Sequence, residues 1–380
     1  MSLPEAVLAA SVLLIFHAYL GYPLTLWGIG LFRQKAVRKG ACEPRVTLII
    51  TAYNEEKRIA AKIANTLDVR YPREKLQILI ASDGSSDRTN EIAGAHAAQG
   101  VELLVLPERK GKENAQKEAV KASIGDVLVF TDVATLLEPC AIERIVSNFA
   151  DPSIGCVSSE DRLMAEDGTP SGEGVYVRYE MWLRRLESRV NSLVGLSGSF
   201  FAARKEVCAD LSGDMQSDFR TLLSCAGNGL RGVCDPSVLG FYRDISDSSR
   251  EFDRKVRTVL RGLTVFFRHL EFLNVFRYGL FSYQYACHKL LRWSVPAFLG
   301  TAFFSNLLLV KEAPFFLGLF LLQLGFYAAA AWGWRRADGA AGGNLLKIPV
   351  YFVTVNASIV VAWWRYLRRQ RIVMWTPSER

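Results

Sequence analysis

Residues 76–87 read LQILIASDGSSD, and this stretch decides the fold class. Its first six residues form a short apolar run, which predicts a buried strand. The next six, from Ser82 to Asp87, combine aspartate, glycine and serine, the residue types that build turns and begin helices. A helical pattern then continues to about Ala98. This order of strand, polar turn and helix predicts one unit of an α/β fold.

The same alternation recurs on both sides of this stretch. Further strands are predicted at Val46–Thr51, Val101–Leu106 and Asp126–Phe130, with helical patterns from about Asn54 to Leu67 and from about Asn114 to Ala122. Strands that alternate with helices of this length predict parallel βαβ units. We therefore expect a mostly parallel sheet with helices on both faces.

Polar residues follow three of the predicted strands at the point where each strand ends. Asn54, Asp83 and Asp132 should therefore lie along one edge of the sheet, where open α/β sheets bind their ligands. A structural role is also open, because Asn54 can begin a helix and Asp83 can close a turn. The sequence contains neither a GxGxxG fingerprint nor a P-loop, so dinucleotide and ATP chemistry lose their usual support.

The N-terminal region predicts a membrane anchor. No Lys, Arg, Asp or Glu occurs from Ala6 to Leu31, a run long enough to cross a bilayer with some tilt. Arg33 and Lys35 follow directly, which places that end of the span in the cytoplasm. A cleaved signal peptide is the alternative, but no basic residue precedes the run and no small-x-small site closes it.

The C-terminal third contains three more apolar runs, at Trp293–Val310, Ala313–Trp334 and Ile348–Trp364. Their number of true spans stays open, because four crossings would put the basic tail outside, against the positive-inside rule. We expect four parts: a transmembrane anchor with its basic flank (1–43), a cytoplasmic α/β domain (44–250), basic amphipathic interfacial helices (251–292), and transmembrane helices with a basic tail (293–380).

The charge of +8 at pH 7 could indicate a nucleic-acid partner. However, the basic residues gather at the membrane flanks and between 250 and 292, where Arg254 to Arg268 interleave with apolar residues. This pattern predicts an amphipathic helix on anionic membrane lipid, and no nucleic acid. The seven cysteines are odd in number and lack CxxC spacing, so we expect reduced thiols without a zinc site.

Several stretches together resemble the membrane-bound family 2 glycosyltransferases. They include VTLIITAYNEEKRIAAKIANTL from residue 46, LQILIASDGSSDRTNEIA from residue 76, RKGKENAQKEAVKASIGDVLVFTD from residue 109 and GLSGSFFAARKEV from residue 195. The similarity runs from about residue 44 onward. It implies the glycosyltransferase-A fold, a Rossmann-like sheet domain that uses nucleotide-activated sugars.

The resemblance also implies a role for individual residues. Ala52, Tyr53, Asn54 and Glu55 would surround the nucleotide, and the carboxylate of Asp83 would accept a hydrogen bond from the uracil N–H. Lys112 would lie in a mobile loop and neutralise the diphosphate. Its alternative interpretation is a solvated loop lysine.

Asp132 matches the first aspartate of the DxD-type motif, which holds the ribose and a divalent metal, here Mg²⁺ or Mn²⁺. Ala134 stands where the second acid or amide of that motif is usual. Mg²⁺ is commonly held by one or two carboxylates, while phosphates and water complete its octahedron. We therefore expect Asp132 to bind the metal only together with the donor diphosphate.

Asp218 matches the family's catalytic base, although it could instead cap the helix that begins there. Arg254 and Arg257 occupy the Gln and Arg positions of the QxxRW motif, and Arg257 keeps the cation expected near the diphosphate or faces lipid. Three replacements depart from the family: Ala134, Ser217 for the first acid of the pair, and Thr258 for the Trp. The last one weakens a processive, cellulose-like interpretation.

The leading hypothesis is an inverting glycosyltransferase, multi-pass in the cell membrane with its catalytic domain in the cytoplasm. It would transfer a sugar from a UDP-sugar to a lipid-linked or polysaccharide acceptor. One alternative is a non-catalytic subunit that binds nucleotide sugar or a partner enzyme. A channel or carrier is weaker, because the apolar runs lack the ionisable residues that mark translocation paths.

Overall fold

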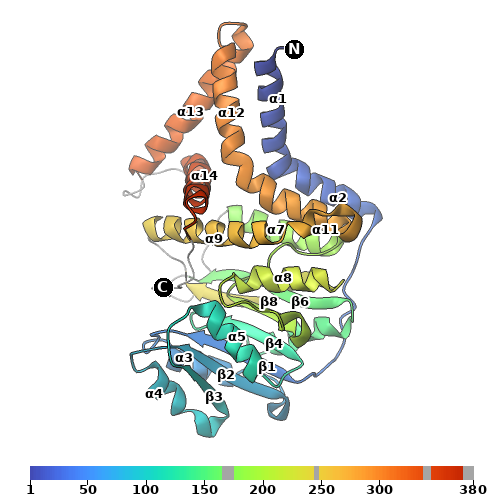
Figure 1. Ribbon diagram of the computed structural model, residues 1–380, viewed down its shortest axis with the longest axis vertical. Helices are drawn as coiled ribbons and strands as arrows, with labels where there is room; N and C mark the ends of the chain where they lie inside the picture. Colours follow the sequence, from blue (N-terminus) through green and yellow to red (C-terminus); the bar gives the residue numbers. More distant parts are fainter. Residues whose placement is uncertain (165–174, 244–247, 337–343, 371–380) are drawn as a thin grey trace. The chain divides into compact units, whose positions relative to one another are not determined.

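The computed structural model describes residues 1–164, 175–243, 248–336 and 344–370 (Figure 1). Within them the chain divides into two compact units. The sheet unit comprises Leu26–Ser246 and Arg268–Gln284, and the helical unit comprises Met1–Thr25, Asp247–Phe267 and Tyr285–Arg371. The expected four-part division of the chain stays a prediction.

One mixed sheet forms the centre of the sheet unit. Its strands are β1 (Val46–Ala52), β2 (Leu76–Asp83), β3 (Val101–Leu106), β4 (Val127–Asp132), β5 (Leu136–Leu137), β6 (Ile154–Met164), β7 (Phe200–Arg204) and β8 (Arg231–Arg243), in the order β3-β2-β1-β4-β7-β6-β8-β5. The first four strands in this order are parallel, β7 is antiparallel to β4 and β6, and β6 is parallel to β8. The α/β architecture with a largely parallel sheet is confirmed.

The helices of both units follow in chain order. They are α1 (Leu3–Phe16), α2 (Tyr22–Phe32), α3 (Ile59–Leu67), α4 (Thr89–Gly94), α5 (Lys112–Ala122), α6 (Ala141–Val146), α7 (Val175–Val190), α8 (Ser217–Gly227), α9 (Ser248–Arg268), α10 (Val275–Tyr278), α11 (Leu280–Tyr285), α12 (Arg292–Leu309), α13 (Pro314–Arg336) and α14 (Asn344–Leu367).

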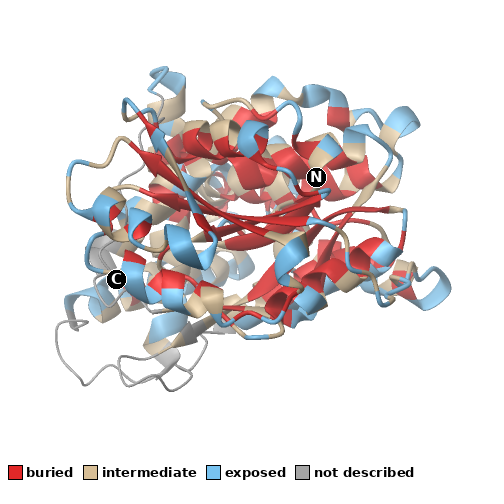
Figure 2. Cartoon of the chain, turned by 90° about the horizontal axis from the view of Figure 1, so that it is seen from below, coloured by how far each residue is buried: buried red, intermediate tan, exposed pale blue. Residues whose placement is uncertain are grey.

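Helices cover both faces of the parallel strands, which is why all seven residues of β1 are buried. Ile49 packs with side chains of α5 and α8 on one face. Leu48 and Ile50 point to the other face, where α6 packs near Leu48, and α3 and α4 pack near Ile50. Figure 2 shows the buried strands as a central layer between helices whose outer sides are exposed.

The register brings the carboxyl ends of three strands to one level. Ala52 at the end of β1 pairs with Ser82 of β2, and Thr51 pairs with Asp132 of β4. The chain continues from β1 to β2 on one side and adds β4 on the other, so strand order reverses at β1. A switch point of this kind opens a crevice for ligands between the strand ends.

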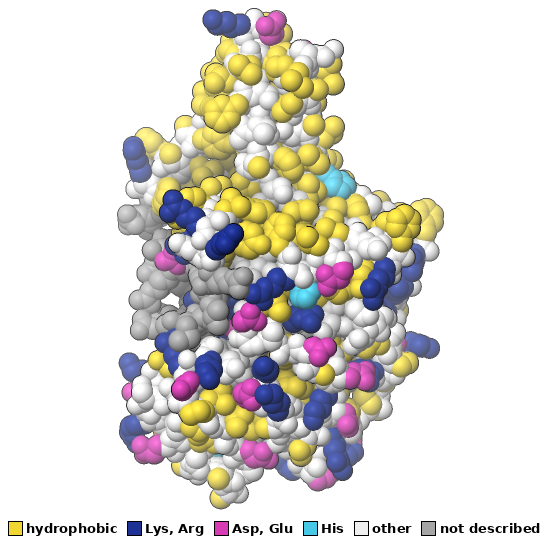
Figure 3. All heavy atoms as spheres, in the orientation of Figure 1, with side chains coloured by type: hydrophobic (Ala, Val, Ile, Leu, Met, Phe, Trp, Pro, Cys, Tyr) yellow, Lys and Arg dark blue, Asp and Glu magenta, His cyan; other side chains and the backbone are white. Residues whose placement is uncertain are grey.

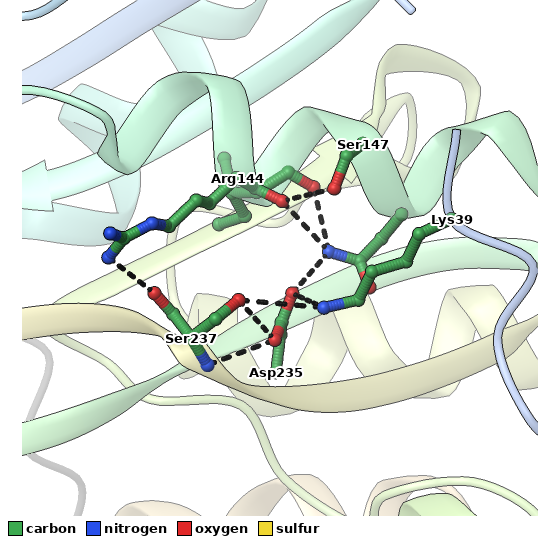
Figure 4. Close-up of polar contacts among 7 residues, drawn as sticks. Lys39, Arg144, Ser147, Asp235 and Ser237 are labelled. Carbon is green, nitrogen blue, oxygen red and sulfur yellow. Dashed lines mark hydrogen bonds and ion pairs between the residues drawn. The ribbon is translucent and has the colours of Figure 1, made fainter. Parts of the chain in front are cut away.

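A buried aspartate ties the segment before β1 to the far side of the sheet. Asp235 of β8 accepts hydrogen bonds from Lys39 Nζ and from Asn148 Nδ2, each at 2.7 Å, and from the Ser237 hydroxyl (Figure 4). Arg144 of α6 donates to the Ser237 carbonyl at 3.0 Å. Because Asp235 is only 2% exposed, these partners replace the water that its carboxylate loses on folding.

The chain carries apolar helices near both ends of its described residues, as expected. Leu3–Phe32, Pro314–Arg335 and Leu346–Leu367 are long and apolar enough to cross a membrane. The run expected at Trp293–Val310 forms helix α12, which does not meet that standard; it contains Pro296, a glycine and a buried asparagine. Figure 3 shows hydrophobic side chains gathered on the outside of these helices. The chain is therefore a membrane protein by the length and composition of its helices.

Candidate functional site

The aspartate at the end of β2 fixes the loop that precedes α5. Asp83 is 3% exposed, and its two carboxylate oxygens accept hydrogen bonds from Lys110 N at 2.9 Å and Gly111 N at 2.7 Å. Gly84 has a φ of +64°, and a Cβ there would come within 2.6 Å of Arg109 N. The two loops can therefore approach only because residue 84 is a glycine. Each oxygen of Asp83 keeps a second lone pair for a ligand.

The residues after β1 join the same cluster. Asn54 adopts the left-handed conformation with a φ of 51°, and its side-chain oxygen accepts from Ser86 N at 2.9 Å. Its own N–H donates to the Ser85 hydroxyl at 3.2 Å. The guanidinium of Arg109 lies 3.8 Å from the centre of the Tyr53 ring. The residues predicted to surround the nucleotide therefore contact one another across three segments, those after β1, β2 and β3.

Ala52 and Glu55 of the predicted pocket are both buried, at 1% and 3% exposure. The Glu55 carboxylate accepts from Arg58 Nε at 2.7 Å, and its N–H donates to the Thr89 hydroxyl at 2.7 Å. Burial raises the pKa of Glu55, and the charge of Arg58 opposes that effect. Glu55 thus anchors the segment after β1 to the neighbouring helix.

Lys112 and Asp132 form an ion pair at the centre of the site. The ammonium of Lys112 binds Asp132 Oδ1 and donates to the Gly198 carbonyl at 2.9 Å. Lys112 is the first residue of helix α5 and is 9% exposed, whereas the sequence predicted a mobile loop. The loop ends one residue earlier, at Gly111 with a φ of +100°. The ammonium is therefore positioned by a helix.

Asp218 lies next to Gly198. It is the second residue of α8 and is 8% exposed, and its oxygens accept from Phe219 N at 2.8 Å and Gln216 Nε2 at 3.1 Å. A Cβ on residue 198 would lie 3.1 Å from Asp218 Oδ2, so the Gly198 backbone lies against this carboxylate. Asp218 and Lys112 are thus both neighbours of Gly198, and Lys112 also binds Asp132.

The donor set around Asp132 fits a divalent cation only in part. Among the described residues, no three His, Cys, Asp or Glu side chains come together as a metal site. Asp132 is a single carboxylate, and it already binds one cation, the Lys112 ammonium. An oxygen ligand of this kind suits Mg²⁺ or Mn²⁺ when phosphate oxygens and water supply the other positions.

Lys62 was not singled out from the sequence, and its buried side chain contacts residues on either side of Asp132. Lys62 is 1% exposed, and its ammonium donates to Thr131 Oγ1 at 3.0 Å and to the Thr135 carbonyl. Burial lowers its pKa to about 7, and the negative charge of Asp132 opposes that effect. The helical spacing of apolar residues could have predicted this burial, since Lys62 shares the buried face of α3 with Ile59, Ile63 and Thr66.

A second unpredicted residue near the site is the acid Asp161 on β6. Its Oδ1 accepts from the hydroxyls of Ser197 at 2.6 Å and Ser199 at 3.1 Å. Burial raises the pKa of Asp161, and the charge of Arg184 opposes this. The Ser199 carbonyl in turn accepts from Asp132 N at 3.1 Å. The segment 197–199 therefore connects Asp161 with the residues around Gly198.

Arg254 and Arg257 lie on helix α9 of the helical unit. The site described above lies within the sheet unit alone. The part of these two arginines in donor binding stays a prediction. The remaining predicted residues all belong to the sheet unit and surround the ends of β1, β2 and β4.

Comparison with known proteins finds one family over the region that contains this site. A family model described as Glycosyl transferase family 2 matches residues 47–211, which include every strand end discussed above. The chain is 27% identical over 171 residues to the poly-beta-1,6-N-acetyl-D-glucosamine synthase of Staphylococcus aureus strain COL. It is 28% identical over 150 residues to an N-acetylglucosaminyltransferase of Mesorhizobium japonicum.

These matches cover only part of each chain. The first match spans 44% of this chain and 41% of the synthase. The second spans 38% of this chain and 35% of the N-acetylglucosaminyltransferase. A solved structure is similar over nearly the whole length: the mannosyltransferase PcManGT from Pyrobaculum calidifontis, in complex with GDP-Man and Mn²⁺. It covers 97% of this chain and 100% of its own, with a TM-score of 0.75 and 23% identity. At that identity the similarity establishes the fold.

Proposed function

The chain carries a family 2 glycosyltransferase domain over residues 47–211, and on this premise we propose the reaction that it catalyses. In this reaction the enzyme transfers a sugar, with inversion at the anomeric carbon, from a UDP-sugar to a lipid-linked or polysaccharide acceptor. The observation that carries this proposal is that Asp218 and Lys112 both lie next to Gly198, with Lys112 paired to Asp132. A carboxylate and a cation that are both neighbours of Gly198 support the proposal.

This arrangement suits an in-line displacement at the anomeric carbon. The Asp218 carboxylate takes the proton from the acceptor hydroxyl as that oxygen attacks. The bond from the anomeric carbon to the diphosphate oxygen breaks, and negative charge develops on the leaving nucleoside diphosphate. The Lys112 ammonium, positioned by α5, stabilises that charge. Asp83 and the residues after β1 orient the nucleotide.

A divalent cation would sit at Asp132. Mg²⁺ or Mn²⁺ supplies additional positive charge to the diphosphate when it is bound there. The single carboxylate and its present pairing with Lys112 support binding of the metal together with the nucleotide. PcManGT, which shares the fold, was solved with GDP-Man and Mn²⁺, so a guanine nucleotide belongs in any donor test.

The reaction takes place at the cytoplasmic face of the cell membrane in this proposal. The apolar helices at both ends support a multi-pass protein. The basic residues after the first span, among them Arg33 and Lys35, support a cytoplasmic sheet unit. An acceptor that is attached to lipid, or that grows toward the membrane, would be available at this face.

A donor screen tests the function. The full chain in detergent, with total lipid extract and Mn²⁺, is offered UDP-sugars and GDP-mannose, and release of nucleoside diphosphate is measured. We expect turnover with at least one donor, and a loss of 10²- to 10⁴-fold in kcat for Asp218→Asn, the usual effect of removing a general base. Asp210→Asn, an exposed acid in the same region, is the matched control.

Two results would contradict the proposal. Full activity in Asp218→Asn would exclude the assigned base. Tight nucleotide binding without turnover across the whole donor panel would favour the second candidate, a non-catalytic subunit. Ala134 and Ser217, which replace the expected acids, are the observations that favour that candidate.

A further inference from the structure

We propose that Lys62 is a positioning residue of the donor site, which holds the turn that carries Asp132. This inference rests on the proposed function, because it assumes that Asp132 binds the donor diphosphate or its metal. It assigns a role to a buried cation that the chemistry described above does not use. Lys62 itself reaches Asp132 only through the backbone and the neighbouring threonines.

The contacts of Lys62 enclose the turn from both ends. Its ammonium donates to Thr131 Oγ1, one residue before Asp132, and to the carbonyl of Thr135, three residues after it. The turn is closed from within by Thr135 N, which donates to the Asp132 carbonyl at 3.1 Å. One side chain of α3 therefore holds the start and the end of the segment that presents Asp132.

A second side chain of the same helix acts on the same segment. Asn65, one turn after Lys62, donates from Nδ2 to the Leu137 carbonyl at 2.9 Å and accepts from Leu137 N at 2.9 Å. Residues 131–137 are thus bound to α3 by two polar side chains at positions i and i+3, which face the same way on a helix. The segment cannot shift without breaking these hydrogen bonds, of which the two from Lys62 are buried.

The cost of this arrangement argues for a function. Both acceptors of the Lys62 ammonium are neutral oxygens, and the side chain is 1% exposed. A buried ammonium without a directly bound carboxylate destabilises a fold, and an apolar side chain of the same length would fill the position at lower cost. Strongly perturbed buried groups of this kind gather at functional sites.

The replacement at position 134 explains why the turn has to be held. With Ala134 in place of a second ligand, only Asp132 can bind from this turn. When a turn supplies only one carboxylate ligand, the orientation of that carboxylate depends on the backbone that carries it. Binding sites require ligands held to within about half an ångström of the productive geometry.

The test compares the Mn²⁺ and donor dependence of four proteins: the wild type, Lys62→Met, Lys62→Gln and Lys121→Met. Methionine keeps an unbranched side chain of nearly the same length, one atom shorter, and removes both hydrogen bonds. Glutamine restores a neutral N–H donor. Lys121 is an exposed lysine near the end of α5 and pairs with Glu118, so its variant controls for loss of a lysine charge.

We expect Lys62→Met to raise the half-saturating Mn²⁺ concentration and the donor KM about tenfold or more, with a smaller change in kcat. Lys62→Gln should recover part of the affinity, and Lys121→Met should match the wild type. A donor and Mn²⁺ dependence equal to the wild type in a folded Lys62→Met protein would overturn the proposal. So would a loss of activity that only follows a loss of Tm.

Two further measurements keep the result interpretable. If Lys62→Met does not fold, Thr131→Val removes one of the two acceptors while keeping the lysine, and the same shift in Mn²⁺ dependence is expected. A wild type that binds and turns over no donor refutes the proposed function. A wild type that turns over donor, beside an unchanged Lys62→Met, refutes the positioning role alone.

Discussion

Replacing Lys62 by methionine should make the protein more stable, by an amount that depends on pH. Burial lowers the pKa of Lys62 from 10.5 to about 7 in the folded chain. Between these two values the unfolded chain binds the proton and the folded chain does not, so the stability of the wild type rises with pH across that window. The maximal slope for one proton is about 1.4 kcal/mol per pH unit.

The size of the effect follows from the same two values. Keeping this ammonium charged in the folded state costs on the order of 5 kcal/mol at low pH, and on the order of 4 kcal/mol near pH 7. The hydrogen bonds to Thr131 and Thr135 return about 1–3 kcal/mol when they are present. Lys62→Met should therefore stabilise the chain by roughly 2 kcal/mol at pH 7, and this gain should vanish toward pH 9 to 10.

Thermal unfolding of the full chain in detergent, followed by tryptophan fluorescence at pH 6, 7, 8 and 9, measures this difference. The Tm of Lys62→Met should exceed that of the wild type most at pH 6, and the two should converge as pH rises. Lys121→Met, which loses an exposed lysine, should show a constant offset. A pH-independent difference between Lys62→Met and the wild type would refute the assignment of a costly buried charge.

Three further outcomes follow from the site. Gly84→Ala should lower the Tm and weaken donor binding, because residue 84 has a positive φ and its new Cβ would lie 2.6 Å from Arg109 N. An unchanged donor affinity in the folded variant would argue against coupling of the two loops. Gly198→Ala should lower kcat about tenfold or more, because its Cβ would lie 3.1 Å from Asp218 Oδ2; an unchanged kcat in the folded variant would contradict this. Calorimetry should detect Mn²⁺ only when nucleotide is present, whereas tight binding to the free protein at Asp132 would contradict the single-carboxylate site. Asp132→Asn should remove this nucleotide-dependent binding.

The parallel strands could be predicted closely from the sequence. Val101–Leu106 appears as predicted, and β1, β2 and β4 extend only one or two residues beyond their predicted ends. The reason is physical: a strand covered on both faces is a continuous apolar run, and that run ends where the chain reaches solvent. The helix expected from Asn54 begins later, at Ile59, because the intervening residues bind the neighbouring DGSS turn.

Local patterns located the site residues along the chain, but they could not place one beside another. Asp83, Asp132 and Asp218 were recognisable from the strands that precede them or from family resemblance. Their connection through Gly198 depends on contacts between residues 20 or more positions apart. No local pattern encodes such distances.

By itself, the sequence determined the α/β class, the edge of the sheet where the polar residues after the strands gather, and the apolar helices, because each depends on hydropathy repeated over short distances. Only the tertiary structure decided that Lys112 begins a helix and pairs with Asp132, and that Lys62 holds the turn beneath them. The pKa of a lysine and its partners depend on burial and on distant neighbours, which packing alone sets.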